Sequence, residues 1–407
     1  MINKNKAAQS RQLVFSILLS FILLSCEESG TVGAGFINES EIVADTIMVS
    51  ELPIKSVDPY LGKLIYSATG AFNDPILGEI NAMALFKPSI IQGDIGDLPM
   101  DTKALLRLNI DIENIYGRQD REARFKVLRV ADFWRGSAFK RSDEVSVVES
   151  DGGPIEQQVG EFTLADFDTT GFAELELSGN WKSDFIRFYN NDDANRDSVY
   201  RHEDFGLAIV PEDDANEIIY ARISTSRLLL IDPADEDTTT NIMLDWATDI
   251  EITGGTAPAN NVVLSNLYDQ YLQFNFTDIA QNLDNNNFVR AELVLTANEN
   301  ALQNSLTENE ERFETPPFRI QLGPSNDIAY DLGFNTISST ASYDEGKYRF
   351  DITELFNASI FADTDITEVY LYAGQNSGYL SFSSFFDVTA DAANAPKIII
   401  FNLESEE

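Results

Sequence analysis

The sequence contains one cysteine, Cys26, and one histidine, His202, among its 407 residues. A disulfide needs two cysteines, and a structural zinc site usually draws several of its four ligands from Cys and His. The two scarce residue types therefore exclude an internal disulfide and a Cys/His zinc centre.

Basic residues are also scarce, with 28 Lys and Arg against 67 Asp and Glu, for a net charge of −39. A surface this acidic repels a phosphate backbone, which argues against nucleic-acid binding. The hydrophobic content of 43%, with 11% aromatic residues, is too high for a disordered acidic tail. The composition therefore predicts a folded protein, with two or three domains expected from the length.

Long hydrophobic runs are absent apart from residues 13–25, which follow Lys4, Lys6 and Arg11 and are interrupted only by serines. A membrane-spanning helix needs about 20 apolar residues, so this run is too short to span a bilayer. A basic start followed by a short apolar segment predicts a signal peptide over residues 1–25. An ordinary secretory peptide with an incidental cysteine is the alternative.

The run ends in Leu23-Leu24-Ser25-Cys26, which resembles the lipobox of bacterial lipoproteins. The resemblance implies cleavage before Cys26, lipidation of its thiol with acyl chains such as palmitate, and attachment to the lipid bilayer. Glu27 and Glu28 resemble the surface-export signals of Bacteroidota lipoproteins, which implies a lipid-anchored outer-membrane protein at the cell surface. Removing three of the 28 basic residues and no acidic ones would leave a net charge of −42.

From about Ser50 onward, short β-branched and aromatic runs alternate with Asn, Asp, Gly and Pro clusters, which predicts an all-β fold of antiparallel β-sandwich type. Long amphipathic helices are nearly absent, and short helical turns are expected near Trp181 to Tyr189 and Thr353 to Ala358. The expected strands include 106–112, 125–130, 172–177, 205–210, 272–276, 291–295, 348–352, 369–372 and 398–401.

The same order of segments occurs near 104–231 and again near 290–403, which suggests a duplication. The alternative is the alternation that all sandwiches share. We expect a tether over 26–45, a first sandwich domain over 46–231, an acidic linker over 232–261 and a second sandwich domain over 262–407.

Three features together resemble an uncharacterised family of Bacteroidota lipoproteins, domain of unknown function 4270. They are the lipobox with its acidic sequel, the segment Val32 to Phe36, and Gly70-Ala71-Phe72-Asn73-Asp74-Pro75-Ile76-Leu77-Gly78-Glu79. A looser similarity is to DNRLRE-type jelly-roll modules, carried by Ala291 to Leu295, Asp351-Ile352-Thr353 and Pro396 to Phe401. These resemblances imply a jelly-roll-like fold and bring no enzymatic activity with them.

No catalytic constellation is visible in the sequence. His202 is the only histidine that could serve a Ser-His-Asp triad, and no Gly-x-Ser-x-Gly segment presents a nucleophile. We expect His202 in a solvated loop. Paired carboxylates of a glycoside hydrolase stay an alternative that 67 acidic residues cannot exclude.

One candidate cofactor is calcium, since Asp193, Asn195 and Asp197 stand at positions 1, 3 and 5 of an EF-hand-like loop with Asp204 at position 12. Ser198 replaces the usual glycine at position 6. A solvated acidic loop is the alternative.

The candidate ligand-binding residues are Trp134, Tyr370 and Tyr372, with Tyr268, Tyr271 and Tyr379 as further aromatic candidates. Tyr370 and Tyr372 are two residues apart, so they point to one face of a strand. Burial in the core is the alternative for this pair, whereas Trp134 is expected at an exposed strand end.

The sequence therefore predicts a surface-exposed lipoprotein with a non-catalytic binding or adhesion role, for which a glycan is one candidate ligand. An accessory subunit of an outer-membrane protein complex is the alternative, and a hydrolase with paired carboxylates is a third.

Overall fold

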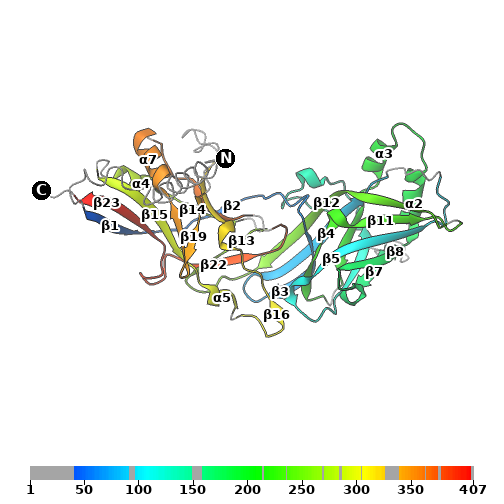
Figure 1. The fold of residues 1–407 in the computed structure, drawn as a ribbon, viewed down its shortest axis with the longest axis horizontal. Helices are drawn as coiled ribbons and strands as arrows, with labels where there is room; N and C mark the ends of the chain where they lie inside the picture. Colours follow the sequence, from blue (N-terminus) through cyan, green and yellow to red (C-terminus); the bar gives the residue numbers. More distant parts are fainter. Residues whose placement is uncertain are drawn as a thin grey trace, which may run out of the picture.

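The computed structural model describes residues 41–404, apart from 91–96, 149–157, 213–214, 235, 268–269, 284–286, 304, 326–338, 363 and 375–376. The predicted signal peptide, Cys26, residues 27–40 of the tether and the aromatic candidate Tyr268 lie outside the described residues. The chain forms an all-β sandwich protein with two lobes arranged along its longest axis (Figure 1). Lobe 1, at the right of the view, is built on strands β3 to β12, and lobe 2, at the left, is built on β1, β2 and the later strands.

Lobe 1 consists of antiparallel strands joined into one continuous sheet that folds back on itself. Its strands are β3 (Ser67–Asp74), β4 (Gly78–Pro88), β5 (Lys103–Arg118), β6 (Arg124–Arg129), β7 (Gln158–Thr163), β8 (Phe172–Leu177), β9 (Leu207–Pro211), β10 (Glu217–Ala221), β11 (Arg227–Ile231) and β12 (Thr238–Gly254). Its helices are α2 (Gly179–Tyr189) and α3 (Arg196–Glu203), with 3-10 turns η1 (Gly136–Ala138), η2 (Leu164–Asp166) and η3 (Ile223–Thr225).

Lobe 2 has two main sheets, in the strand orders β1-β23-β15-β20-β19 and β18-β17-β21-β14-β2, and a separate β13-β22 pair. Its strands are β1 (Glu41–Met48), β2 (Ile54–Ser56), β13 (Asn261–Ser265), β14 (Gln270–Phe274), β15 (Phe288–Thr296), β17 (Ile320–Pro324), β18 (Ser339–Thr340), β19 (Ser342–Asp344), β20 (Lys347–Asp351), β21 (Val369–Ala373), β22 (Phe382–Phe386) and β23 (Lys397–Glu404). The helical segments are α4 (Thr277–Gln281), α5 (Glu299–Gln303), α7 (Thr353–Ala362) and η4 (Pro317–Arg319).

The predicted domain order is wrong at its start, because the first described strands belong to lobe 2. Strand β1 pairs antiparallel with β23 at the other end of the chain, and β2 pairs with β14. Residues 46–56 are therefore part of lobe 2. The end of the predicted tether over 26–45 is also wrong, because strand β1 begins at Glu41. The chain enters lobe 2, crosses to lobe 1 and returns. The local sequence carries no signal for this exchange, since the partner of β1 lies at the far end of the chain.

The predicted linker over 232–261 is also wrong, because most of it forms β12. This strand pairs with β11 from Thr238 to Ile242 and with β4 from Met243 to Gly254. Thr239, Asn241 and Met243 alternate inward and are buried. The Pro, Asp and Gly residues that suggested a linker lie in the turns on either side, while the β-branched threonines between them favour a strand.

The pairing pattern repeats between the lobes in the way the predicted duplication requires. In lobe 1, β5 lies between β8 and β11, and in lobe 2, β15 lies between β20 and β23. Strand β6 pairs with β9 as β17 pairs with β21. Helix α2 follows β8 as α7 follows β20, which confirms both expected helices. The two segments thus share strand order and pairing, not only alternation.

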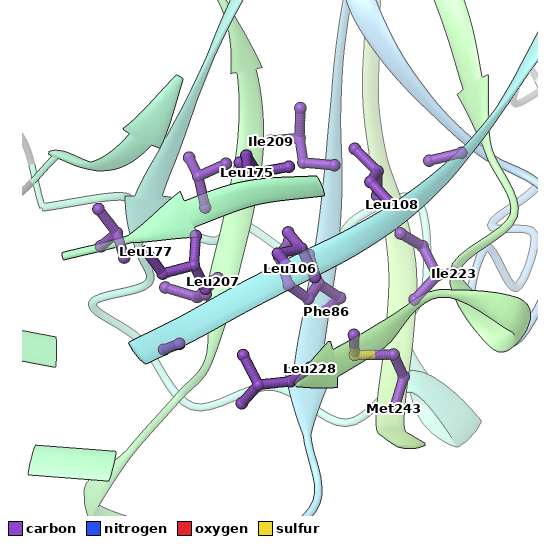
Figure 2. Close-up of a cluster of buried hydrophobic side chains, with 14 of the residues drawn as sticks. Phe86, Leu106, Leu108, Leu175, Leu177, Leu207, Ile209, Ile223, Leu228 and Met243 are labelled. Carbon is purple, nitrogen blue, oxygen red and sulfur yellow. The ribbon is translucent and has the colours of Figure 1, made fainter. Parts of the chain in front are cut away.

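Each lobe has its own hydrophobic core. Figure 2 shows part of the lobe 1 core, where side chains from several strands converge on Leu106 of β5. Leu106, Leu207, Ile209 and Leu228 are each 0% exposed. Fully burying one such side chain stabilises a fold by about 1.5–3 kcal/mol relative to leaving it in water. Burial of the inward-facing side chains of these strands therefore stabilises the folded-back sheet of lobe 1.

A third cluster of buried side chains joins the two lobes. It contains Phe72, Tyr116 and Tyr220 from lobe 1 together with Leu302 and Phe382 from the later segment. Strand β16 (Glu310–Glu311) leaves lobe 2 and pairs with the end of β5. The lobes consequently share buried apolar surface.

A buried ion pair lies within this shared cluster. The Arg312 guanidinium donates to both carboxylate oxygens of Asp74, with Nη2 2.7 Å from each, and the two side chains are 1% and 0% exposed. Asp74 also accepts hydrogen bonds from the Tyr116 hydroxyl at 2.7 Å and from the Ile76 and Leu77 backbone N–H groups. All the hydrogen-bonding capacity of the carboxylate is thus used.

Asp74 belongs to the Gly70-to-Glu79 segment, which forms the β3–β4 hairpin. Gly70 and Gly78 both adopt positive φ, and a Cβ on Gly70 would lie 2.1 Å from the Glu217 carbonyl oxygen. The hairpin can form only with glycine at the close approach. The Gly70-to-Glu79 segment therefore places Asp74 at the junction between the lobes.

Replacing Arg312 by alanine is expected to lower the free energy of unfolding by about 3–5 kcal/mol, because it leaves the Asp74 charge buried without its partner. The Arg107→Ala variant is the control, since Arg107 and its partner Glu174 are 52% and 45% exposed and exposed pairs contribute about 0–1 kcal/mol. Denaturant unfolding of both variants measures the difference. Equal losses would contradict the role assigned to the buried pair.

Glu217, at the start of β10, is a second buried carboxyl group and is 1% exposed. Burial raises its pKa to about 7 from an ordinary value of 4.5, and the negative charge of Asp120 acts in the same direction. The folded protein therefore binds more protons than the unfolded chain between these values. This contribution to stability is fully present below about pH 4.5 and is lost as the pH rises through 7.

The Glu217→Gln variant should accordingly be more stable than the parent protein at pH 8, by up to about 3 kcal/mol, and nearly unchanged at pH 5. Urea unfolding at the two pH values tests this. Glu176→Gln, at an exposed position of β8, is expected to show no such pH dependence. A Glu217→Gln variant that is less stable at pH 8 would overturn the assignment.

Candidate binding site

The outer face of the β18-β17-β21-β14-β2 sheet carries a group of tyrosine rings. In β21, Val369, Leu371 and Ala373 are buried, so Tyr370 and Tyr372 point outward and are half-buried. The predicted single face for this pair is confirmed, and the alternative of core burial is wrong. Sequence alternation alone could not distinguish the two faces, because both have apolar residues.

Tyr271 of the neighbouring strand β14 completes what we call the tyrosine cluster, Tyr271, Tyr370 and Tyr372. Its ring centroid lies 5.0 Å from that of Tyr372 at an interplanar angle of 30°, and 6.3 Å from that of Tyr370. Stacked and tilted rings at these separations attract one another and hold a shared orientation. Leu272 and Phe274 on the opposite face of β14 fix the strand to the core.

Polar side chains surround the tyrosine cluster in the same sheet. Gln321 of β17 pairs with Tyr372, Gln273 of β14 pairs with Tyr370, and Lys55 of β2 pairs with Tyr271. The Gln273 amide donates to the Thr367 carbonyl oxygen at 2.9 Å, which orients it. Amides and an ammonium group beside the rings supply hydrogen-bond donors and acceptors next to an apolar surface.

The cluster hydroxyls stay protonated in the physiological pH range. Burial raises the pKa of Tyr372, and burial together with the neighbouring Tyr372 raises the pKa of Tyr271. Burial and then the Glu368 carboxylate raise the pKa of Tyr370. The rings and hydroxyls of the cluster are therefore uncharged, and they can contact the C–H and O–H groups of a ligand.

Trp134 does not join this site, and its expected exposure is wrong. It is half-buried in lobe 1, where its Nε1 donates to the Phe205 carbonyl oxygen at 2.8 Å and its ring packs edge-on against Phe139. Tyr379 also has a different role, because its hydroxyl donates to Asp111 across the junction between the lobes. Trp134 therefore contributes to the packing of lobe 1.

The predicted calcium loop does not form. Residues 196–203 are helix α3, with Asn195 at its start and Asp204 at its end, so Asp193 and Asp204 are separated by the length of the helix. Asp204 is 0% exposed and accepts from the Gly206 N–H, while Asp193 accepts from the Asn195 N–H. Within the described part of the chain, no group of three His, Cys, Asp or Glu residues is placed to hold a metal ion.

His202 lies on α3 and not in a loop. It is exposed, its Nδ1 lies 2.7 Å from the Ser198 carbonyl oxygen, and its ring stacks on Phe133. These contacts place it on the surface of lobe 1.

In the described residues, no helix is both long enough and apolar enough to cross a membrane. Neither the protein-family models nor the curated proteins contain a match to this chain.

Proposed function

We propose that the protein is a lipid-anchored surface protein that binds a neutral glycan through the tyrosine cluster, without catalysing a reaction. The observation that carries the proposal is the outward position of three neighbouring tyrosines on a sheet whose other face is core. A pyranose ring presents a face of C–H groups that can stack on an aromatic ring, and its hydroxyls can bond to flanking amides.

Aromatic side chains bury large apolar areas, and clusters of them on a protein surface commonly mark binding sites. Gln273 and Gln321 provide both donors and acceptors on either side of Tyr370 and Tyr372. This combination supports an uncharged polyhydroxylated ligand over a purely apolar one.

The anchor part of the proposal rests on Cys26 and the residues around it. Two or three acyl chains give stable attachment, since each buried methylene contributes about 0.8 kcal/mol. The acidic body would be repelled by anionic lipid. The resemblance to the uncharacterised Bacteroidota lipoprotein family supports an outer-membrane, outward-facing location and leaves the ligand open.

A second candidate function, an accessory subunit of an outer-membrane complex, is favoured by strand β1. This strand is at the edge of its sheet, and its side chains Ile42, Ile47 and Met48 are 58%, 36% and 41% exposed. Edge strands with exposed apolar side chains can pair with another chain. Co-purification of a stoichiometric outer-membrane protein from gently solubilised membranes would favour this second function.

The Tyr372→Ala variant should weaken binding to a polysaccharide by about tenfold, equivalent to roughly 1.4 kcal/mol, because it removes the ring that stacks on Tyr271. Affinity electrophoresis in gels containing xylan, mannan or a soluble β-glucan measures the change. Tyr60→Ala is the matched control, since Tyr60 is a 60% exposed tyrosine of the other lobe. Retention of full affinity by Tyr372→Ala, or equal loss in Tyr60→Ala, would argue against the cluster as the glycan site.

Replacing Cys26 by serine removes the thiol that would be acylated, so this variant should leave the membrane fraction and lose metabolic labelling with palmitate.

Protease treatment of intact cells tests the orientation, because an outward-facing protein is cleaved before lysis. Cleavage only after lysis would contradict the surface location, and an unchanged membrane fraction for Cys26→Ser would contradict the lipid anchor.

A further inference from the structure

A pocket of about 210 Å³ lies at the junction between the two lobes. The tip of the β3–β4 hairpin and the end of β12 line it from lobe 1, and β2, β13, β14 and the start of β22 line it from lobe 2. Its lining from β14 includes the buried Leu272, on the face of the strand opposite Tyr271. The pocket is therefore separate from the tyrosine cluster.

The deeper part of the pocket is closed and apolar. Ile76, Ile252, Leu272 and Phe382 line it and are 6%, 7%, 2% and 1% exposed. Ile54 also lines it but belongs to the edge strand β2 and is 56% exposed, so it lies at the opening. A ligand in the pocket would cover apolar surface at both levels, which favours an apolar ligand.

The pocket has no charge to offer a ligand. Among the described residues that line it, none is Asp, Glu, Lys, Arg or His, although 23% of the chain is charged. A charged group that leaves water without a partner is strongly disfavoured. The ligand that the pocket suits is therefore uncharged.

Gln270 is the polar side chain of the pocket that is free to bond to a ligand. Asn261 already accepts from the Asn298 amide at 2.9 Å, and Ser265 Oγ accepts from the backbone N–H two residues later at 3.2 Å. Gln270 shares a face of β14 with Leu272, and its amide forms no hydrogen bond with another described residue. An amide can both donate and accept, so Gln270 suits one uncharged polar group.

The lobe 1 wall is held in place by the buried ion pair. The Ile76 and Leu77 N–H groups both donate to Asp74 Oδ1 at 2.8 Å, and Arg312 fixes the same carboxylate. The Thr256 N–H donates to the Ile76 carbonyl oxygen at 2.8 Å, which joins the hairpin tip to the segment after β12. A preformed wall loses little free energy to ordering when a ligand binds.

The volume of the pocket suits a short aliphatic chain. An apolar cavity of about 150 Å³ can hold benzene, and one methylene takes up roughly the volume of a water molecule in the liquid, about 30 Å³. The pocket therefore has room for a chain of about seven carbon atoms. Its apolar lining is mostly Ile, Leu and Val, and its ring, Phe382, already packs against Tyr116 at 5.9 Å. This lining favours a flexible chain over a planar ring.

We propose that this pocket binds a medium-chain aliphatic compound with an uncharged hydrogen-bonding head, of the class of a fatty amide or a fatty alcohol. The chain lies against the aliphatic side chains of both lobes, and the head bonds to the Gln270 amide. Because both lobes contribute walls, the ligand binds only when the lobes are docked. Its binding therefore stabilises the docked arrangement.

The test uses the full-length protein in lipid nanodiscs, so that no detergent chain competes for the pocket. The probe is an octanamide analogue with a photoreactive diazirine on its chain, and mass spectrometry of the peptides locates the adduct after irradiation. We expect adducts within 76–77, 252–257 and 261–265, with unlabelled octanamide as a competitor. Octanoate has the same chain and a charged head, so it should compete about tenfold less well.

The Ala257→Phe variant should reduce the labelling by about tenfold, because the ring takes up volume that the chain needs. Ala259→Phe is the matched control, since Ala259 lies in the same connection between β12 and β13, is exposed and is not among the lining residues. Gln270→Met keeps the length of the side chain and removes the amide. It should weaken competition by octanamide a few-fold and leave the thermal midpoint close to that of the parent protein.

Adducts spread over the whole chain, adducts that octanamide does not reduce, or equal labelling of Ala257→Phe and Ala259→Phe would overturn the proposal. Octanoate that competes as well as octanamide would also overturn it. Labelling that is blocked on whole cells and regained after purification would show that another protein chain fills the pocket, contrary to the proposal. None of these results bears on the tyrosine cluster, because polysaccharide binding is measured separately with Tyr372→Ala.

Discussion

Asp74 and Arg312 are separated by 238 residues in the sequence and meet in a buried, bidentate ion pair between the lobes. Removing both charges from water is costly, and the cost is offset only because every oxygen of the carboxylate has a donor. Those donors come from the β3–β4 hairpin, from Tyr116 of β5 and from the segment after α5. The pair can therefore exist only when both lobes are folded and docked, which makes their relative position part of the folded state.

The exchange of strands between the lobes strengthens this dependence. Lobe 2 cannot complete its sheets without β1 and β2, which precede all of lobe 1 in the chain. In turn, β16, which follows α5 of lobe 2 in the chain, pairs with β5 of lobe 1. Cutting the chain in the predicted linker would separate β1 and β2 from the rest of lobe 2. It would also separate Arg312 from Asp74 in lobe 1. The protein is thus better described as one folded unit with a duplicated strand pattern than as two tandem domains.

The tyrosine cluster of lobe 2 offers rings with amides beside them. The large net negative charge of the chain raises the local concentration of cations around it. This charge has little effect on the binding of an uncharged glycan at the tyrosine cluster.

Local pattern was sufficient for the strands expected from 106–112 to 398–401, for the helices α2 and α7, for the repeat and for the shared face of Tyr370 and Tyr372. Each of these follows from residues close in sequence and from the periods of strand and helix. The sequence alone also determined the composition limits, the scarcity of Cys and His and the lipobox-like segment at Cys26. Only the tertiary structure decided which face of β21 meets solvent, that Trp134 packs inward, and that residues 238–254 form a strand. It also decided that Asp193 and Asp204 lie apart. These outcomes depend on burial and ion pairing between segments that are distant in the sequence, so a short stretch of sequence does not predict them.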